Sequence, residues 1–158
     1  MDTFDHAILR LLERDGRASY VGLAEQVGLS KTPCWARVQA LEKAGVIRGY
    51  RAVLDPEALG LGLTAFVQVS IEFGSHTAFE AAALAHPAIT ECYTTAGDGD
   101  YLLRVVTRDV GTLDSLLRED LCRLPGVQRF STQICLKTIK DGGALSQTAE
   151  FTQRAAKR

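Results

Sequence analysis

The amino-acid sequence predicts an α+β protein, with a small helical part first and a larger part that mixes strands and helices after it. In the first third, apolar residues recur every three or four positions, which is typical of helices. From residue 63 onward they alternate with polar residues, which is typical of half-buried strands. Between these parts lies the segment 59–62, in which Gly60 and Gly62 loosen the backbone and predict a hinge.

The composition is that of an ordinary globular chain. Its 158 residues are 46% hydrophobic and 23% charged, which supplies a core and argues against disorder. There is no run of about 18 apolar residues, so a membrane span is excluded. The first residues also lack the basic and apolar stretches of a secretory leader, and we expect a cytoplasmic protein.

The cysteines are scattered, at Cys34, Cys92, Cys122 and Cys135, without a C-x-x-C pair. This spacing argues against a zinc site and against a disulfide framework, and we expect each to be a small buried apolar residue. A redox role for Cys34 is the weaker alternative, because an inward-facing thiol is inert.

The first third predicts three short helices. Asp2 or Thr3 caps the first, Ser19 caps the second and Ser30 the third, while Gly28 ends the second helix. A tight turn between the last two helices fits a helix-turn-helix, although generic three-helix bundles use such turns as well.

The charge is unevenly distributed. The net charge is −1, yet the segment 31–51 carries five basic residues against one acidic residue, Glu42. A locally basic segment can neutralise phosphates, and the alternative is a solvated helix face.

A strand is predicted over 48–54, before the hinge. After the hinge we expect a strand over 63–73, a helix over 75–86 with a capping box from Thr77 and Glu80, strands over 89–95 and 101–107, a leucine-rich helix over 113–124 and a strand over 127–139. This β-α-β-β-α-β order is the ferredoxin-like one, with both helices on one face of an antiparallel sheet. The other face needs a cover, for which dimerisation is the usual solution.

The resulting organisation has four parts. They are a helix-turn-helix over 1–48, a linker strand and hinge over 49–62, a ferredoxin-like domain over 63–140, and a polar tail over 141–158 that we expect to be disordered.

Several short stretches resemble the Lrp/AsnC (feast/famine) family. They are Asp15-Gly16-Arg17, Leu23-Ala24, Val27-Gly28-Leu29-Ser30, Thr32-Pro33-Cys34, Arg37-Val38, Leu41-Glu42, Gly45-Val46-Ile47, Gly49-Tyr50, Glu91-Cys92, Gly97-Asp98, Asp100-Tyr101-Leu102-Leu103 and Leu124-Pro125-Gly126-Val127. Each is weak alone, but together they follow the family's order and spacing from about Asp5 to Lys140.

The resemblance implies a winged helix-turn-helix followed by a ferredoxin-like domain of the RAM/ACT type. It implies a sequence-specific transcriptional regulator of double-stranded DNA, a homodimer that assembles into an octamer, and an amino-acid effector bound between C-terminal domains. An architectural protein that wraps DNA with little effector control would use the same surfaces and is the alternative.

The third helix is then expected to enter the major groove. With Cys34, Val38 and Leu41 buried, the DNA-binding residues are predicted to be Lys31, Thr32, Trp35, Ala36, Arg37, Gln39 and Lys43. Gln39 suits a bidentate contact to adenine and Thr32 a thymine methyl group. The basic residues suit phosphates, which position a protein without specifying sequence.

Two of these residues have structural alternatives. Trp35 either meets DNA or packs against a neighbouring helix or a partner head. Arg37 either meets a phosphate or braces Glu42 or the first helix.

The hairpin Gly97-Asp98-Gly99-Asp100-Tyr101 is the candidate effector site. Glycine N–H groups can hold a carboxylate, and Asp98 or Asp100 can accept hydrogen bonds from an α-ammonium. A plain turn is the alternative, and the resemblance favours the site. It also implies that Leu124, Thr132, Gln133 and Ile134 line the pocket, some of them from a neighbouring subunit.

No enzyme is expected. His6, His76 and His86 are isolated, Asp98 and Asp100 are too few for an EF-hand loop, and no nucleophile or nucleotide-binding motif occurs. We therefore expect no cofactor and no metal, only an effector.

Overall fold

The computed structural model describes residues 1–156, which form two compact units. The head comprises Met1–Val53 together with the chain from Lys140 onward, and the body comprises Leu54–Ile139. The tail prediction included residues 157 and 158, which lie outside the described residues.

The head contains the three predicted helices, α1 (Thr3–Arg14), α2 (Tyr20–Val27) and α3 (Lys31–Lys43). The Asp2 side chain caps α1, and the Ser19 hydroxyl accepts from the Gly22 N–H at 3.1 Å to cap α2. Gly28 takes the left-handed conformation between α2 and α3, with φ of 73°. The helices enclose a core made of Ile8, Leu23, Ala24, Cys34, Val38 and Leu41.

The strand predicted over 48–54 is wrong. This segment is assigned no strand, and Val53 is 98% exposed. The reason is that a strand requires a partner for its backbone N–H and C=O groups, and none pairs with this segment among the described residues. A short 3₁₀ helix (Glu57–Leu59) follows, and it ends at Gly60 inside the predicted hinge.

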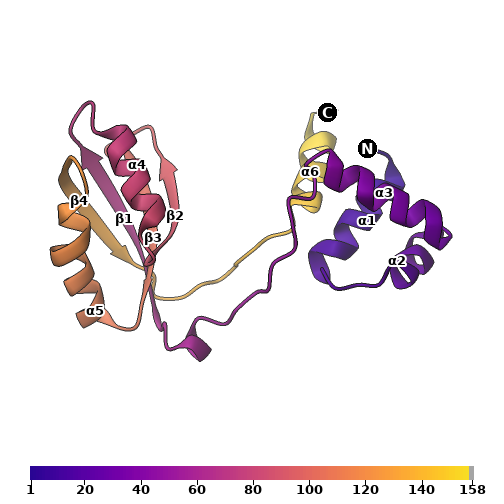
Figure 1. Ribbon diagram of the computed structural model, residues 1–158, viewed down its shortest axis with the longest axis horizontal. Helices are drawn as coiled ribbons and strands as arrows, with labels where there is room; N and C mark the ends of the chain where they lie inside the picture. Colours follow the sequence, from indigo (N-terminus) through magenta and orange to yellow (C-terminus); the bar gives the residue numbers. More distant parts are fainter. Residues whose placement is uncertain (157–158) are drawn as a thin grey trace. The chain divides into compact units, whose positions relative to one another are not determined.

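The expected disorder of the tail is also wrong, because Leu145–Ala155 forms a helix, α6 (Figure 1). Its N-cap position is Ala144, which offers no capping side chain. The carboxylate of Glu13 on α1 replaces it and accepts from the Leu145 N–H at 2.7 Å and from the N–H and hydroxyl of Ser146. Arg10 of α1 then pairs with Glu150 at 3.1 Å, so α6 packs along α1.

The body has the predicted ferredoxin-like order (Figure 1). Its strands are β1 (Leu63–Ile71), β2 (Ile89–Thr94), β3 (Tyr101–Thr107) and β4 (Val127–Ile134), which pair antiparallel in the order β2-β3-β1-β4. Its helices are α4 (His76–Ala85) and α5 (Val110–Ser115), and α5 continues through a π turn (Leu116–Asp120) and a 3₁₀ turn (Leu121–Arg123).

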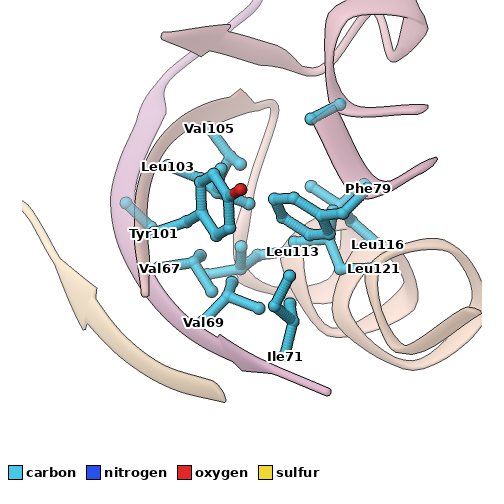
Figure 2. Close-up of a cluster of buried hydrophobic side chains, with 12 residues drawn as sticks. Val67, Val69, Ile71, Phe79, Tyr101, Leu103, Val105, Leu113, Leu116 and Leu121 are labelled. Carbon is cyan, nitrogen blue, oxygen red and sulfur yellow. The ribbon is translucent and has the colours of Figure 1, made fainter. Parts of the chain in front are cut away.

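Both helices cover the same face of the sheet. Alternate residues of β1 (Ala65, Val67, Val69 and Ile71) and of β3 (Tyr101, Leu103 and Val105) meet Phe79 of α4 and three leucines that follow Val110. Figure 2 shows the Phe79 ring beside the Tyr101 ring. The centroids of the two rings are 4.5 Å apart. The side chains that alternate with these, among them Phe66, Leu102 and Val106, therefore lie on the face without helices.

Two strand ends and one helix cap differ from the prediction. β1 ends at Ile71 and leaves Phe73 exposed, and β4 ends at Ile134 because β1, its partner, begins at Leu63. The capping box of α4 does not form, since Ser75 holds the N-cap position and the Glu80 carboxylate accepts from the buried Tyr101 hydroxyl at 2.8 Å instead.

Among the described residues, none of the helices has the length and apolar character needed to cross a bilayer.

Candidate nucleic-acid interface and effector site

The third helix turns one face to the head's core and the opposite face to solvent. Cys34, Val38 and Leu41 are buried on the inner face. Because a helix repeats every 3.6 residues, this burial turns positions 32, 36, 39 and 43 outward. Six of the predicted DNA-binding residues are exposed, namely Lys31, Thr32, Trp35, Ala36, Gln39 and Lys43. Trp35 is 48% exposed, so half of its surface is available to a ligand.

Arg37 is placed differently. Its Nη1 donates to Asp5 Oδ1 at 2.7 Å and lies 2.8 Å from Asp2 Oδ2. Its guanidinium also sits 5.3 Å from the centre of the Phe4 ring. The two carboxylates raise the pKa of Arg37 above its ordinary value. We therefore assign Arg37 to bracing α3 against the start of α1, the alternative that the sequence left open, and not to a phosphate contact.

Glu42 links two residues at the end of α3. Its Oε2 accepts from Gln39 Nε2 at 2.8 Å, and its Oε1 accepts from the Tyr50 hydroxyl at 2.9 Å. Burial, with Glu42 adding, raises the pKa of Tyr50 to about 12. Sequence reasoning missed this link, and the signal for it was that Glu42 is the only acidic residue between Lys31 and Arg51.

The hairpin between β2 and β3 is held by hydrogen bonds to β1 and by hydrogen bonds within the hairpin itself. The Asp100 N–H donates to the Val69 carbonyl at 2.9 Å, and Asp100 Oδ2 accepts from the Ile71 N–H at 2.8 Å. The Thr95 hydroxyl donates to the Gly99 carbonyl at 2.7 Å. One oxygen of Asp100 is thus committed to the fold, whereas Asp98 is exposed.

Gly99 is required by packing. A Cβ at this position would lie 2.5 Å from Cγ of Gln68, so a side chain would have to displace Gln68. Gly97 is exposed and has φ of 152°, a backbone conformation that favours glycine. Only Gly97 of the two glycines therefore presents an open backbone to solvent.

The prediction that Tyr101 meets the effector is not supported by its position. Its side chain is 1% exposed and points into the body's core (Figure 2). Its hydroxyl donates to Glu80 and lies 2.9 Å from His76 Nδ1. Burial, with Glu80 adding, raises the pKa of Tyr101 to about 12.

The remaining predicted effector residues lie at two ends of the sheet. Leu124 packs partly buried against the core, in the turn whose Gly126 carbonyl accepts from the Glu72 N–H at the same end as the hairpin. Thr132, Gln133 and Ile134 pair with β1 residues 67, 66 and 65. Along β1, these partners are about four residues, or roughly 13 Å, from the residues that bond to the hairpin. One copy of the chain therefore does not bring all of them together.

The cysteines correct one expectation. Cys34 is buried, and burial raises the pKa of its thiol, which makes it inert. Cys122 is exposed and Cys92 and Cys135 are only partly buried, contrary to the expectation that every cysteine is buried. No cluster of three metal-ligating side chains occurs within residues 1–156.

A helix-turn-helix head that exposes one face of its third helix, joined to a ferredoxin-like body, defines a class of two-domain DNA-binding regulators. Residues 1–48 match the winged helix-turn-helix DNA-binding family, and residues 64–145 match the Lrp/AsnC ligand binding domain. The chain belongs to the Lrp/AsnC family of transcriptional regulators.

Individual proteins of known family support this family assignment. The leucine-responsive regulatory protein of Escherichia coli K12 is 40% identical over 148 residues, which cover 92% of this chain and 90% of that protein. A transcriptional regulator of Neisseria meningitidis, solved with L-Met, has a TM-score of 0.88 and 36% identity over 91% of this chain and 95% of that one. An AsnC family regulator from Agrobacterium tumefaciens has a TM-score of 0.84 and 35% identity over 89% and 94% of the two chains.

Proposed function

We propose that this regulator reads DNA sequence with the outer face of α3 and that an amino acid bound to the body controls it. The observation that carries the first half is the exposed face of α3 within a locally basic segment.

In this proposal the contacts to DNA divide by chemistry. The amide of Gln39 contacts adenine, and Thr32 contacts a thymine methyl group. Lys31 and Lys43 contact phosphates, which fix the register. Ala36 lies between them on the same face and allows the helix to approach the bases closely.

The effector half rests on the hairpin and on the similarity to a regulator solved with L-Met. The exposed backbone of Gly97 suits the α-carboxylate of an amino acid, and the exposed Asp98 carboxylate suits its ammonium group. Ile134, which is 44% exposed at the other end of the sheet, offers an apolar contact for a side chain.

The same geometry supports a homo-oligomer. The hairpin and Ile134 lie apart within one chain, so a second copy must supply one of them to a shared site. Phe66, Leu102 and Val106 also lie on the face of the sheet that no helix covers, and burying them in a homodimer removes apolar surface from water. Dimers that meet at their effector sites then build the octamer.

The proposal needs no enzyme activity, cofactor or metal, because binding alone accounts for control. It places the protein in the cytoplasm, where bacterial DNA lies.

The experiment is fluorescence anisotropy with labelled DNA from upstream of the protein's own gene, at fixed salt, against random competitor, with and without each amino acid. We expect a preference for the upstream DNA that one amino acid shifts. A preference that no amino acid shifts would support the architectural alternative, and equal binding to both DNAs would contradict sequence-specific regulation.

A further inference from the structure

We infer that Glu42 is a positioning residue for DNA readout, which orients the Gln39 amide toward the bases and is itself held by Tyr50. This inference rests on the proposed function, because it takes Gln39 to be a base-reading residue.

The charge of Glu42 is the first reason. A carboxylate on the recognition helix faces a phosphate backbone of the same sign, which weakens binding to any DNA. Glu42 is the one acidic residue between Lys31 and Arg51, and it sits one residue before Lys43 on the DNA-facing helix. A role in binding specificity would offset this repulsion, whereas a role in bulk affinity would not.

The geometry supplies that role. A carboxylate only accepts hydrogen bonds, so the side of the Gln39 amide that faces Glu42 has to be its NH₂ group. This matches the 2.8 Å contact from Gln39 Nε2 to Glu42 Oε2. The carbonyl of Gln39 and its second N–H then remain free, and these are the groups that adenine N6 and N7 require.

Tyr50 fixes the carboxylate from the other side. Its hydroxyl donates to Glu42 Oε1 at 2.9 Å, and its ring packs beside Gly16, at which a Cβ would lie 3.4 Å from the ring. Each oxygen of Glu42 therefore has one protein donor. An exposed glutamine otherwise samples several rotamers and loses that freedom on binding, so this arrangement orients the amide before DNA arrives.

The test uses Glu42→Gln, which keeps the shape but can both donate and accept, so that the Gln39 amide is no longer held in one orientation. Dissociation constants for upstream and random DNA are measured by anisotropy, and thermal unfolding checks the fold. We expect the ratio of the two constants to fall roughly threefold to tenfold, although loss of one negative charge strengthens binding to both DNAs. Tyr50→Phe should lower the ratio less. The matched control Glu25→Gln removes the same charge from the exposed surface of α2 and should leave the ratio unchanged.

A double variant separates the inference from the proposed function. If Glu42 acts through Gln39, adding Glu42→Gln to Gln39→Ala lowers the ratio no further. A wild-type ratio in Glu42→Gln, or an equal further loss in the Gln39→Ala background, would overturn the inference while the proposed function stands. A wild-type ratio in Gln39→Ala alone would overturn the proposed base contact itself, and the inference with it.

Discussion

The head is stabilised by different internal contacts from those that stabilise the body. The head has six buried core residues and relies on side-chain links between distant segments, such as Arg37 with Asp5 and Glu13 with the start of α6. The body has twelve buried core residues and a four-stranded ladder, and two of its ion pairs join close neighbours in sequence. The head's architecture should therefore respond to single polar changes, and the body's to loss of apolar volume.

The largest effect should come from the body's core. Phe79→Ala removes a ring that is fully buried against Tyr101 and should lower the free energy of unfolding by about 3–5 kcal/mol (Figure 2). Urea unfolding followed by circular dichroism measures the loss. Trp35, the one tryptophan, reports on the head separately by its fluorescence.

The matched control is Phe73→Ala, since this ring is exposed on the same unit. It should change the free energy of unfolding by less than about 0.5 kcal/mol. A similar loss in both variants would contradict the assigned core.

The next prediction separates the functions of the two units. Asp98→Asn in the body should abolish the amino-acid response and leave DNA affinity unchanged. Lys43→Ala in the head should weaken binding to upstream and random DNA alike and reduce the slope of log affinity against log salt by about 1. Anisotropy titrations over a range of salt, with and without the effector, measure both. An intact response in Asp98→Asn would move the site away from the hairpin.

A smaller effect should follow from uncapping α6. Glu13→Ala removes the only acceptor that the structure gives to the Leu145 and Ser146 N–H groups and should cost about 1 kcal/mol. Hydrogen exchange should then speed up in residues 145–155 and stay the same in the body. Unchanged exchange in α6 would show that apolar packing alone holds it.

The smallest expected effect is on the stability of the body at low pH. The Thr112 N–H, with the Thr112 hydroxyl and Arg108 adding, holds the pKa of Asp109 at about 2, below its ordinary value of 3.8. The unfolded chain therefore takes up this proton first, so the stabilisation is present above about pH 4 and is lost as the pH falls toward about 2.

Asp109→Ala should make the body's unfolding midpoint less sensitive to pH between about pH 4 and pH 2. The head should keep its own acid sensitivity, because the Asp5 N–H lowers the pKa of Asp2, with Arg37 adding to this effect. Midpoints measured by circular dichroism and by Trp35 fluorescence, at each pH, distinguish the two units.

Local signals predicted most of the fold. The caps at Asp2 and Ser19 and the left-handed Gly28 are properties of a few adjacent residues. Alternation predicted β1, and the glycine-rich turn between two apolar runs predicted β2 and β3. The exposed face of α3 was predictable for the same reason, since burial of Cys34 and Val38 determines which residues turn outward.

Several of the features that the sequence did not predict depend on a partner that lies far away in the sequence or is missing. The cap of α6 is supplied by Glu13, 132 residues before Leu145, and the segment 48–54 has no strand beside it. Arg37 is held by Asp2 and Asp5, over thirty residues earlier. Glu42 and Tyr50 lie closer, but no periodicity signals a hydrogen bond between a helix and the chain that leaves it.

The return of α6 to α1 has a consequence for the order of synthesis. Translation delivers α1, α2 and α3 first, yet Glu13 meets its partners only after the whole body has left the ribosome. The head is thus begun first and finished last. A nascent chain released before residue 145 would carry a head in which the Arg10 and Glu13 side chains face water.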